Sequence, residues 1–274
     1  MDRLNDFLPE ACYTPQNLNK NDVIYAFLNK KTVVGSVIDM DVDRSLLLVQ
    51  LGDNIIAELP FNEVTIYQYT YSKNTPEYTV PLQIATLKGK TICAKITSIY
   101  DEKVVLSRKR NMLEAFEVLK GNEMLPFLVT NTRPTHVYGD VGYGLEGIIY
   151  IRNLCKARIF TTSEILKKGD SIFVKLLSTE EPFYFNVSYR ETFPEYDYTN
   201  YQRGDTLIGR VGNAVNNNSC GFFVQITPQV CGILDYDISL PLIRYGDMVE
   251  CTISRATPKG LHLKFVKIVD NVKK

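Results

Sequence analysis

The chain has 274 residues, of which 45% are hydrophobic, and it carries 31 basic and 31 acidic side chains. This length allows two or three small domains with cores of their own, and the hydrophobic fraction excludes wholesale disorder. No apolar run approaches the roughly 20 residues that span a membrane, and the first ten residues lack the basic start and apolar centre of a secretory signal.

The cysteines and histidines do not fit a metal centre. Six cysteines lie far apart in the sequence without a CxxC pair, and the chain has two histidines. This usage is typical of reduced thiols buried in strands and of a protein outside the secretory pathway. We therefore expect a cytoplasmic protein with no metal, no cofactor and no membrane partner.

Charge is distributed unevenly along the chain, although the net charge is zero. Residues 1–70 carry 5 basic and 10 acidic side chains, whereas residues 201–274 carry 9 basic and 6 acidic side chains. An acidic region repels phosphate and suits a protein-docking surface, and a basic region attracts RNA. We therefore expect different partners for the two ends of the chain.

A short pattern occurs three times in the sequence. A glycine that precedes a run of strand-forming residues stands at Gly89, Gly169 and Gly246, at intervals of 80 and 77 residues. This interval suits a five-stranded barrel of about 70 residues followed by a linker. The repeat predicts an all-β protein of three tandem five-stranded barrels.

The first unit covers residues 28–108. Alternating apolar residues predict strands at residues 32–40, 45–51, 54–59, 91–100 and 103–107. The long connection between the third and fourth of these strands contains Tyr67, Tyr69, Tyr71 and Tyr78. Such a stripe of tyrosines either faces RNA or forms one side of an extra strand packed on the barrel.

A helix is predicted after the first unit, over residues 108–120. Met112, Phe116 and Leu119 recur at helical spacing, and Gly121 is placed to end the helix. The helix is therefore expected to link the first two barrels.

The second unit covers residues 125–192 and contains the spelling Gly142-x-Gly144-x-x-Gly147. A dinucleotide fingerprint of this form needs a preceding strand and a following helix whose N-terminus meets the pyrophosphate. Residues 148–151 favour a strand instead. We therefore interpret the three glycines as hairpin and bulge residues.

The third unit covers residues 203–267 and follows an acidic, tyrosine-rich stretch. Its strands are predicted at residues 205–211, 221–227, 230–234, 251–255 and 261–266. Adjacent residues of a strand face opposite sides of the sheet. One of Phe222 and Phe223 is therefore expected inside the barrel and the other outside.

The third unit also carries the fullest set of motif residues, at positions 207–211 (LIGRV), 220–224 (CGFFV), 232–234 (GIL) and 246–247 (GD). Together these resemble the tandem OB-fold repeat of the bacterial ribosomal protein S1 family. In that repeat a glycine-bearing first strand leads to an aromatic-Gly-Ala-Phe-Val strand, then a Gly-Leu-Val-His strand and a Gly-Asp turn. The resemblance implies that Phe223 is the outward phenylalanine.

The other two units resemble the same repeat in part. The matching residues are 34–37 (VGSV) and 104–109 (VVLSRK) in the first unit, and 144–151 (GLEGIIYI) and 168–170 (KGD) in the second. The resemblance covers residues 30–267 and implies three OB-fold barrels with a linker helix after the first. The expected segments are an N-terminal extension (1–27), barrel 1 (28–108), linker helix (109–124), barrel 2 (125–192), linker (193–202), barrel 3 (203–267) and tail (268–274).

The resemblance also implies an RNA-binding face, because the family uses second-strand aromatics, a third-strand histidine and polar residues at the last hairpin. In barrel 3 the corresponding residues are Phe223, Tyr236, Arg255, Lys259 and His262, with Asp235 where the histidine would stand. In barrel 2, Tyr150 replaces the histidine, and His136 or Tyr138 supplies an aromatic. Barrel 1 lacks the set, and the resemblance therefore implies that residues 1–108 dock on a protein of the small ribosomal subunit.

These observations predict a non-catalytic protein that binds single-stranded RNA, in particular mRNA at the small ribosomal subunit during translation. His136 and His262 lie in different units and neither has the spacing of a nucleophile or a metal site, so no enzymatic activity is expected. Two alternatives stay open. One is a protein-interaction adaptor whose barrels have lost RNA binding, and the other is a regulator of RNA decay or transcription.

Overall fold

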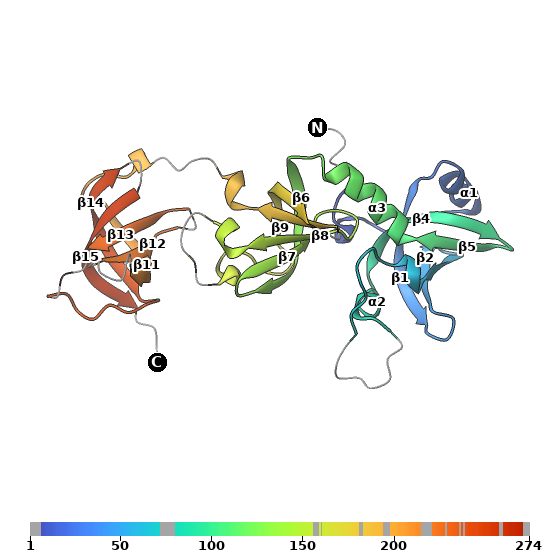
Figure 1. The fold of residues 1–274 in the computed structure, drawn as a ribbon, viewed down its shortest axis with the longest axis horizontal. Helices are drawn as coiled ribbons and strands as arrows, with labels where there is room; N and C mark the ends of the chain where they lie inside the picture. The colour runs from blue at the N-terminus through green and yellow to red at the C-terminus, as the bar shows by residue number, and fades with distance from the viewer. Residues whose placement is uncertain are drawn as a thin grey trace. The chain divides into compact units, whose positions relative to one another are not determined.

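The computed structural model describes the chain except for residues 1–6, 72–79, 156–158, 160, 181–182, 194–197, 215–220, 228, 236, 238, 258–259 and 271–274. The described strands form three closed five-stranded barrels in tandem (Figure 1). The predicted fold class, all-β with three barrels, is confirmed. By their contacts, residues 1–130, 138–148 and 171–187 form one compact unit and the other residues a second, and each is described by itself.

The three barrels share one strand order. Barrel 1 consists of β1 (Thr32–Asp41), β2 (Leu46–Gly52), β3 (Ile55–Pro60), β4 (Thr91–Tyr100) and β5 (Lys103–Ser107). Neighbours follow the order β1-β2-β3-β5-β4, and β4 pairs with β1 to close the barrel. The pairing of β3 with β5 is parallel and the others are antiparallel. This topology is that of the predicted OB-fold.

Barrels 2 and 3 repeat this order. Barrel 2 consists of β6 (Met124–Arg133), β7 (His136–Asp140), β8 (Glu146–Tyr150), β9 (Ser171–Glu180) and β10 (Tyr184–Ser188). Barrel 3 consists of β11 (Thr206–Ala214), β12 (Gly221–Gln225), β13 (Cys231–Asp235), β14 (Met248–Thr257) and β15 (Gly260–Asp270). The parallel pairs are β8 with β10 and β13 with β15.

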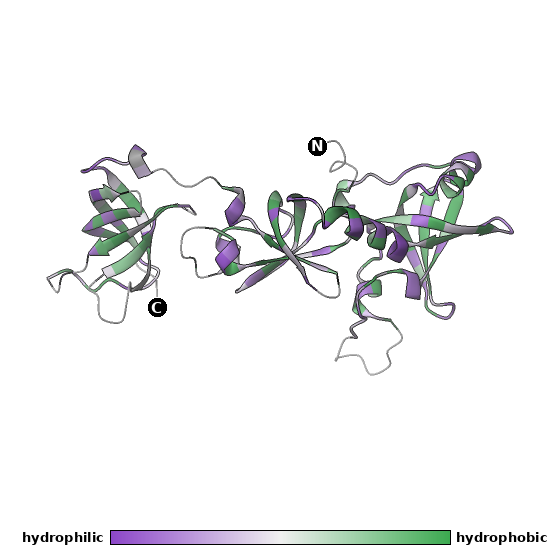
Figure 2. Cartoon of the chain, turned by 45° about the horizontal axis from the view of Figure 1, so that its top comes forward, coloured by the Kyte–Doolittle hydropathy of each residue, from purple (hydrophilic) through white to green (hydrophobic). Residues whose placement is uncertain are grey.

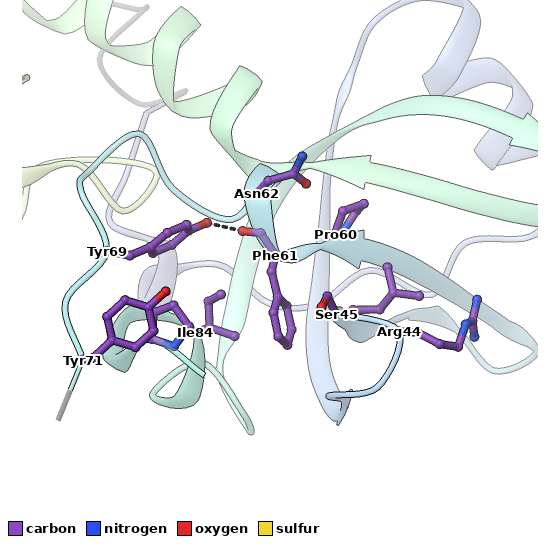
Figure 3. A pocket seen from close by; sticks show the side chains of 10 residues that line it. Arg44, Ser45, Pro60, Phe61, Asn62, Tyr69, Tyr71 and Ile84 are labelled. Atoms are coloured by element: carbon purple, nitrogen blue, oxygen red, sulfur yellow. Dashed lines mark hydrogen bonds between the residues drawn. The ribbon is translucent and has the colours of Figure 1, made fainter. Parts of the chain in front are cut away.

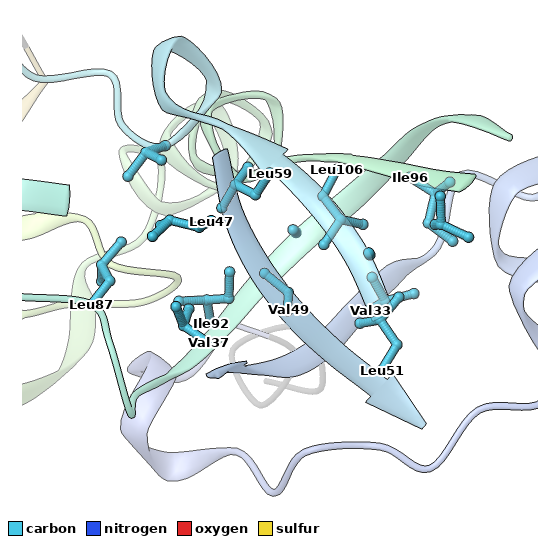
Figure 4. Close-up of a cluster of buried hydrophobic side chains, with 14 of the residues drawn as sticks. Val33, Val37, Leu47, Val49, Leu51, Leu59, Leu87, Ile92, Ile96 and Leu106 are labelled. Atoms are coloured by element: carbon cyan, nitrogen blue, oxygen red, sulfur yellow. The ribbon is translucent and has the colours of Figure 1, made fainter. Parts of the chain in front are cut away.

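Each barrel is filled by the inward residues of alternating strands. In barrel 1, Leu47, Val49 and Leu51 of β2 are fully buried, and they meet Leu59 of β3 and Leu106 of β5 (Figure 4). Hydrophobic and hydrophilic residues alternate along the strands, as Figure 2 shows. This period of two explains why the strands of barrel 1 lie within one or two residues of their predicted bounds.

The helix between the first two barrels is present as predicted. Helix α3 (Arg108–Leu119) begins at Ser107, whose hydroxyl accepts a hydrogen bond from the backbone N–H of Arg110. Met112 and Leu119 are fully buried, in agreement with the helical period of apolar residues. Among the described helices, none is long and apolar enough to cross a membrane.

A further helix, α1 (Lys20–Leu28), lies in the segment that the sequence assigned to an extension. Asn19 forms a capping box with Asp22 at its start. Ile24, Tyr25 and Leu28 are exposed. Because apolar residues lie on both faces of α1, the sequence carried no amphipathic signal for this helix.

The remaining helical turns are short. They are α2 (Leu82–Ala85) and the 3-10 turns η2 (Glu10–Cys12), η3 (Phe61–Glu63), η4 (Ile151–Asn153), η5 (Thr162–Glu164), η6 (Arg190–Thr192) and η7 (Tyr198–Asn200).

The described part of the tyrosine-rich connection of barrel 1 does not form the extra strand that was one expectation. The described residues 64–71 contain no strand, because Thr70 bonds to Gln83 and Leu82 of the α2 turn and not to a sheet edge. Tyr69 packs against the core of barrel 1, as that expectation had it, whereas the buried Tyr67 stacks on Tyr184 of barrel 2. Tyr71 is exposed, and Tyr78 lies outside the described residues.

The last hairpin of barrel 3 is longer than predicted. Strands β14 and β15 pair over their whole lengths, with three shifts of register that let the hairpin bend around the barrel. Val266 and Val269 are exposed near the end of β15. Buried and exposed residues no longer alternate there. The sequence pattern therefore predicted a strand that ends at residue 266, before the end of β15.

The three glycines of the rejected dinucleotide motif lie in and beside the β7–β8 hairpin. Gly142, Tyr143 and Gly144 all have positive φ, and the N–H of Leu145 donates to the carbonyl of Gly142. Gly147 lies on β8, where a Cβ atom would meet Val141 at 2.6 Å. The interpretation of a hairpin is therefore correct, and no helix follows the motif.

Candidate nucleic-acid interface

The strand register of barrel 3 brings residues from four strands into one line. Phe223 of β12 pairs with Ile233 of β13, Ile233 with His262 of β15, and His262 with Arg255 of β14. We call these four residues the barrel-3 row. Adjacent strands lie about 4.8 Å apart, so the row extends about 14 Å across the barrel surface. Three of the four residues are among those singled out from the sequence.

The barrel-3 row faces outward. Val224, Leu234, Leu261 and Leu263, which flank the row on the same strands, are buried in the core. Phe222 and Phe223 are both partly exposed; Phe222 packs against that core, and Phe223 lies on the opposite side of β12. This side of β12 is the one on which the motif expects the outward phenylalanine.

The barrel-3 row combines three kinds of side chain that suit single-stranded nucleic acid. Phe223 offers an aromatic face for stacking, and Ile233 is a partly exposed apolar residue beside it. His262 adds a polar ring, and the exposed Arg255 adds a cation that can meet phosphate. The arrangement can bind RNA without reading a particular sequence.

Other predicted residues of barrel 3 are not placed. Tyr236 and Lys259 lie outside the described residues, so their roles stay predictions. Asp235, at the end of β13, is exposed and pairs with Gly221 across the strands. An acidic side chain therefore stands beside the row, which weakens its attraction for phosphate at that end.

Barrel 2 carries a corresponding set of residues. Hydrogen bonds from Val141 N–H to Leu145 O and from Ile151 N–H to Thr135 O set the register of the β7–β8 hairpin. This register places Tyr138 opposite Ile148, and Ile148 pairs with Asn186 of β10. The line Tyr138–Ile148–Asn186, which we call the barrel-2 row, matches Phe223–Ile233–His262 strand for strand.

The sequence did not identify Ile148 and Asn186 as candidate site residues, because only the pairing of the strands places them in this row. Asn186 donates from its side-chain nitrogen to Glu180 at 3.3 Å, and it is partly exposed.

The same register places His136 of β7 opposite Tyr150 of β8. Nδ1 of His136 lies 3.0 Å from the hydroxyl of Thr135, and the guanidinium of Arg152 lies over the ring of Tyr150 at 5.7 Å. A cation over an aromatic face is attracted by the ring, so Arg152 brings positive charge next to Tyr150. Arg152 was missed from the sequence because it follows the strand, in the η4 turn.

Barrel 1 has the same line of positions but different chemistry. Leu48 of β2 pairs with Glu58 of β3, Glu58 with Val105 of β5, and Val105 with Ser98 of β4. This barrel-1 row contains no aromatic ring and no cation, and it contains a carboxylate. The structure therefore supports the expectation that barrel 1 differs from the other two.

A groove of about 440 Å³ opens on barrel 1 near this row (Figure 3). Phe61, Tyr69 and Tyr71 line it, and the hydroxyl of Tyr69 donates to the carbonyl of Phe61. Arg44 is the cation among the described lining residues, and it is held by Glu58 at 2.6 Å and by Asp41 at 3.8 Å. Because its charge is compensated, the groove does not favour phosphate.

Within the described residues, no group of three or more His, Cys, Asp or Glu side chains could hold a metal ion. His136 and His262 lie on strands of different barrels, as the sequence predicted.

Comparison with known proteins identifies curated relatives named small ribosomal subunit protein bS1. The Staphylococcus aureus protein is 27% identical over 189 residues, which cover 66% of this chain and 43% of the relative. The homologue in Bacillus cereus is 27% identical over 224 residues, which cover 76% and 54%. That in Bacillus subtilis is 27% identical over 162 residues, which cover 54% and 41%. These relatives confirm the predicted resemblance to ribosomal protein S1, and the chain spans about half of their length.

No protein-family model matches the chain. Among solved structures, a multidomain protein with nucleic acid binding domains from Streptococcus pneumoniae is 17% identical and covers 87% of this chain and 74% of that one. Its TM-score is 0.24.

Proposed function

We propose that this chain is a non-catalytic protein that binds single-stranded RNA and captures mRNA at the small ribosomal subunit, in the cytoplasm. The observation that carries the proposal is the barrel-3 row, in which Phe223, His262 and Arg255 come from three strands to one outward line. The curated relatives named small ribosomal subunit protein bS1 support the ribosomal part of the proposal.

In this proposal the barrel-3 row binds RNA through stacking and charge. A base stacked on an aromatic side chain contributes about 1–3 kcal/mol, and this contribution depends little on the base. Arg255 meets a phosphate, which makes the affinity depend on salt. Residues 201–274 carry 9 basic and 6 acidic side chains, so the charge of this region favours RNA.

The barrel-2 row and the Tyr150–Arg152 pair provide further points of contact in the proposal. Each barrel alone would bind weakly, because a single stacked base and one or two phosphate contacts give little free energy. Joined barrels raise the affinity through effective concentration and do not require a particular RNA sequence. This suits the capture of diverse unstructured segments of mRNA.

Residues 1–108 dock on the small ribosomal subunit in this proposal, and they do not bind RNA. The barrel-1 row supports this division, since Leu48, Glu58, Val105 and Ser98 offer neither stacking nor positive charge. Residues 1–70 are also acidic, with 5 basic and 10 acidic side chains.

The proposal is tested by fluorescence anisotropy of a labelled single-stranded RNA of about 12–20 nucleotides, titrated with the full chain at two salt concentrations. Micromolar or tighter binding that weakens with salt supports RNA capture. Absence of binding at the lower salt concentration contradicts it.

A second candidate function is a protein-interaction adaptor. Two acidic residues favour it. Asp235 stands beside the barrel-3 row, and Glu58 lies in the barrel-1 row. An adaptor would show no salt-sensitive affinity for RNA, so the same titration separates the two functions.

A further inference from the structure

The groove of about 440 Å³ on barrel 1, which we call the barrel-1 groove, is built from segments that are far apart in the sequence. Its lining comes from the start of β2, the end of β3, the η3 turn, residues 69–71 and the α2 turn. In Figure 3, Tyr71 lies toward one end of the groove and Arg44 toward the other, with Phe61 between them. The volume lies within the range of roughly 300–1,000 Å³ that is typical of pockets that hold ligands.

One end of the barrel-1 groove is aromatic and apolar. Tyr71, Ile84 and Phe61 follow one another along it in Figure 3. Tyr71 is 53% exposed, so a partner can reach its ring. Grooves lined by aromatic rings bind extended segments that contain proline, and aromatic faces also attract the guanidinium of arginine. This end therefore suits a segment that carries proline or arginine.

Hydrogen bonds to the α2 turn fix the segment that carries the tyrosines. Nε2 of Gln83 donates to the carbonyl of Gln68 at 3.2 Å and to Oγ1 of Thr70 at 3.0 Å. Oε1 of Gln83 accepts from the N–H of Thr70 at 3.0 Å, and the N–H of Leu82 donates to the carbonyl of Thr70 at 2.9 Å. A groove whose walls are already held in place loses little conformational entropy when a partner binds, so a few contacts are enough for binding.

The other end of the barrel-1 groove is acidic. Arg44 lies there, and its guanidinium is held by Glu58 at 2.6 Å and by Asp41 at 3.8 Å. The exposed Asp43 precedes Arg44 in the same turn. These three carboxylates outnumber the one guanidinium, so this end attracts a cation and repels phosphate.

We propose that the barrel-1 groove binds an extended basic segment of a partner protein. A proline or an apolar residue of this segment packs against Phe61 and Tyr71, and a lysine or arginine pairs with the carboxylates of Asp41 and Asp43. The inference deepens the proposed function, because it rests on the docking of residues 1–108 on a protein and names the surface that docks.

Charge and the form of the groove together select this partner. RNA would bring phosphates next to the three carboxylates, and an acidic segment would meet the same repulsion. An extended segment presents successive side chains to the surface on which it lies, so that one residue meets the rings and another meets the carboxylates. A basic segment with proline satisfies both ends of the groove.

Fluorescence anisotropy with the full chain at low salt tests the proposal. The probes are labelled synthetic peptides of about 12 residues that alternate arginine with proline, arginine with serine, or glutamate with proline. The Arg-Pro peptide should bind about fivefold or more tightly than the Arg-Ser peptide, because proline also packs on the rings. The Glu-Pro peptide should not bind. Absence of binding by the Arg-Pro peptide, or equal affinities for the three peptides, would overturn the proposal.

Two variants assign the binding to the two ends of the groove. Tyr71→Ser removes the exposed ring, so the affinity for the Arg-Pro peptide should fall by about fivefold and approach the affinity for the Arg-Ser peptide. The double variant Asp41→Asn with Asp43→Asn should weaken the binding of both arginine peptides by a similar factor and reduce its dependence on salt. Circular dichroism checks that each variant folds, and the double variant decides the question if Tyr71→Ser does not fold.

The matched control is Tyr25→Ser, which removes another exposed tyrosine of the same compact unit. Tyr25 lies on α1, outside the groove, and is 61% exposed. This variant should keep both the affinity for the Arg-Pro peptide and the preference over the Arg-Ser peptide. Equal losses in Tyr71→Ser and Tyr25→Ser would contradict the assignment to the groove.

A failure of the groove is distinguishable from a failure of RNA binding, because the peptide titrations contain no RNA. If the Arg-Pro peptide does not bind and labelled single-stranded RNA does, the groove is wrong and RNA capture stands. Tyr71→Ser should bind that RNA as tightly as the unchanged chain. A loss of RNA affinity in Tyr71→Ser that Tyr25→Ser does not show would assign the groove to nucleic acid and overturn the proposal.

Discussion

Phe223 of β12 and His262 of β15 lie on the same outward face of barrel 3, with Ile233 of β13 between them. The two positions are far apart in the sequence and come together because β13 pairs with both strands. In barrel 1 the corresponding positions hold Leu48 and Val105, on either side of Glu58. The three barrels therefore share one strand order, and in the proposed function the residues at these positions distinguish a barrel that binds RNA from one that does not.

Arg255 should contribute to affinity through charge alone, since it is exposed at the end of the barrel-3 row. Arg255→Ala should weaken binding to all single-stranded RNA sequences by a similar factor. It should also lower the slope of log affinity against log salt by about one. Anisotropy titrations at several salt concentrations measure the slope. Lys88→Ala, on barrel 1, is the matched control, and an equal loss of slope there would contradict the assignment.

The ion pair of Arg108 with Glu10 should matter far more than a surface pair of equal length. Arg108→Met leaves the buried carboxylate of Glu10 unpaired, which costs about 3–5 kcal/mol. Lys20 pairs with Glu102 at 2.8 Å, but both side chains are about four-fifths exposed, so Lys20→Met should have no measurable effect. Chemical denaturation compares the two, and similar losses would show that burial does not decide the contribution.

Tyr67 should stabilise the contact of its segment with Tyr184 and Glu146 of barrel 2 through its hydroxyl. Its ring stacks on Tyr184 at a centroid distance of 4.9 Å, and its hydroxyl accepts from the N–H of Glu146 at 2.7 Å. Tyr67→Phe leaves that N–H without its partner and should cost about 1–3 kcal/mol. Thermal unfolding measures the loss. Tyr71→Phe, at an exposed tyrosine of the same segment, should leave the midpoint unchanged.

Gly139 should not tolerate a side chain, because it lies directly against a core ring. A Cβ atom there would approach Phe127 to 2.3 Å, and Phe127 is fully buried. Gly139→Ala should therefore destabilise barrel 2 by about 1–3 kcal/mol. At Gly121, after helix α3, the nearest atom to a Cβ would be the carbonyl oxygen of Val118 at 3.6 Å. Gly121→Ala should change stability by less than about 0.5 kcal/mol, and an equal loss at both sites would contradict the packing argument.

The strands of these barrels could be predicted because their burial alternates with a period of two. Strands β4 and β5 have the predicted bounds, and helix α3 ends one residue before its predicted end. This alternation does not predict an element whose pattern of buried and exposed residues departs from it. Helix α1 exposes apolar residues, and the far end of β15 exposes Val266 and Val269, so neither element was predicted correctly.

The candidate site could be predicted only in part, because motif positions name residues but not their neighbours. Phe223, Arg255 and His262 follow from the motif. Ile233 and Asn186 join the rows through the parallel pairing of the third and fifth strands, which a linear sequence does not display. The junction of Glu10 with Asp140 is also absent from any local pattern, since it connects a short turn to a hairpin 130 residues away.

In the proposed function the barrel-3 row, and not its counterpart in barrel 1, holds single-stranded RNA. The most direct measurement compares the affinities of Phe223→Ala and Leu48→Ala for the same labelled RNA, each in the full chain and at low salt. Loss of one stacked base predicts a fall of about 5- to 150-fold for Phe223→Ala and a change of less than about twofold for Leu48→Ala. Equal effects, or a larger loss for Leu48→Ala, would contradict the account.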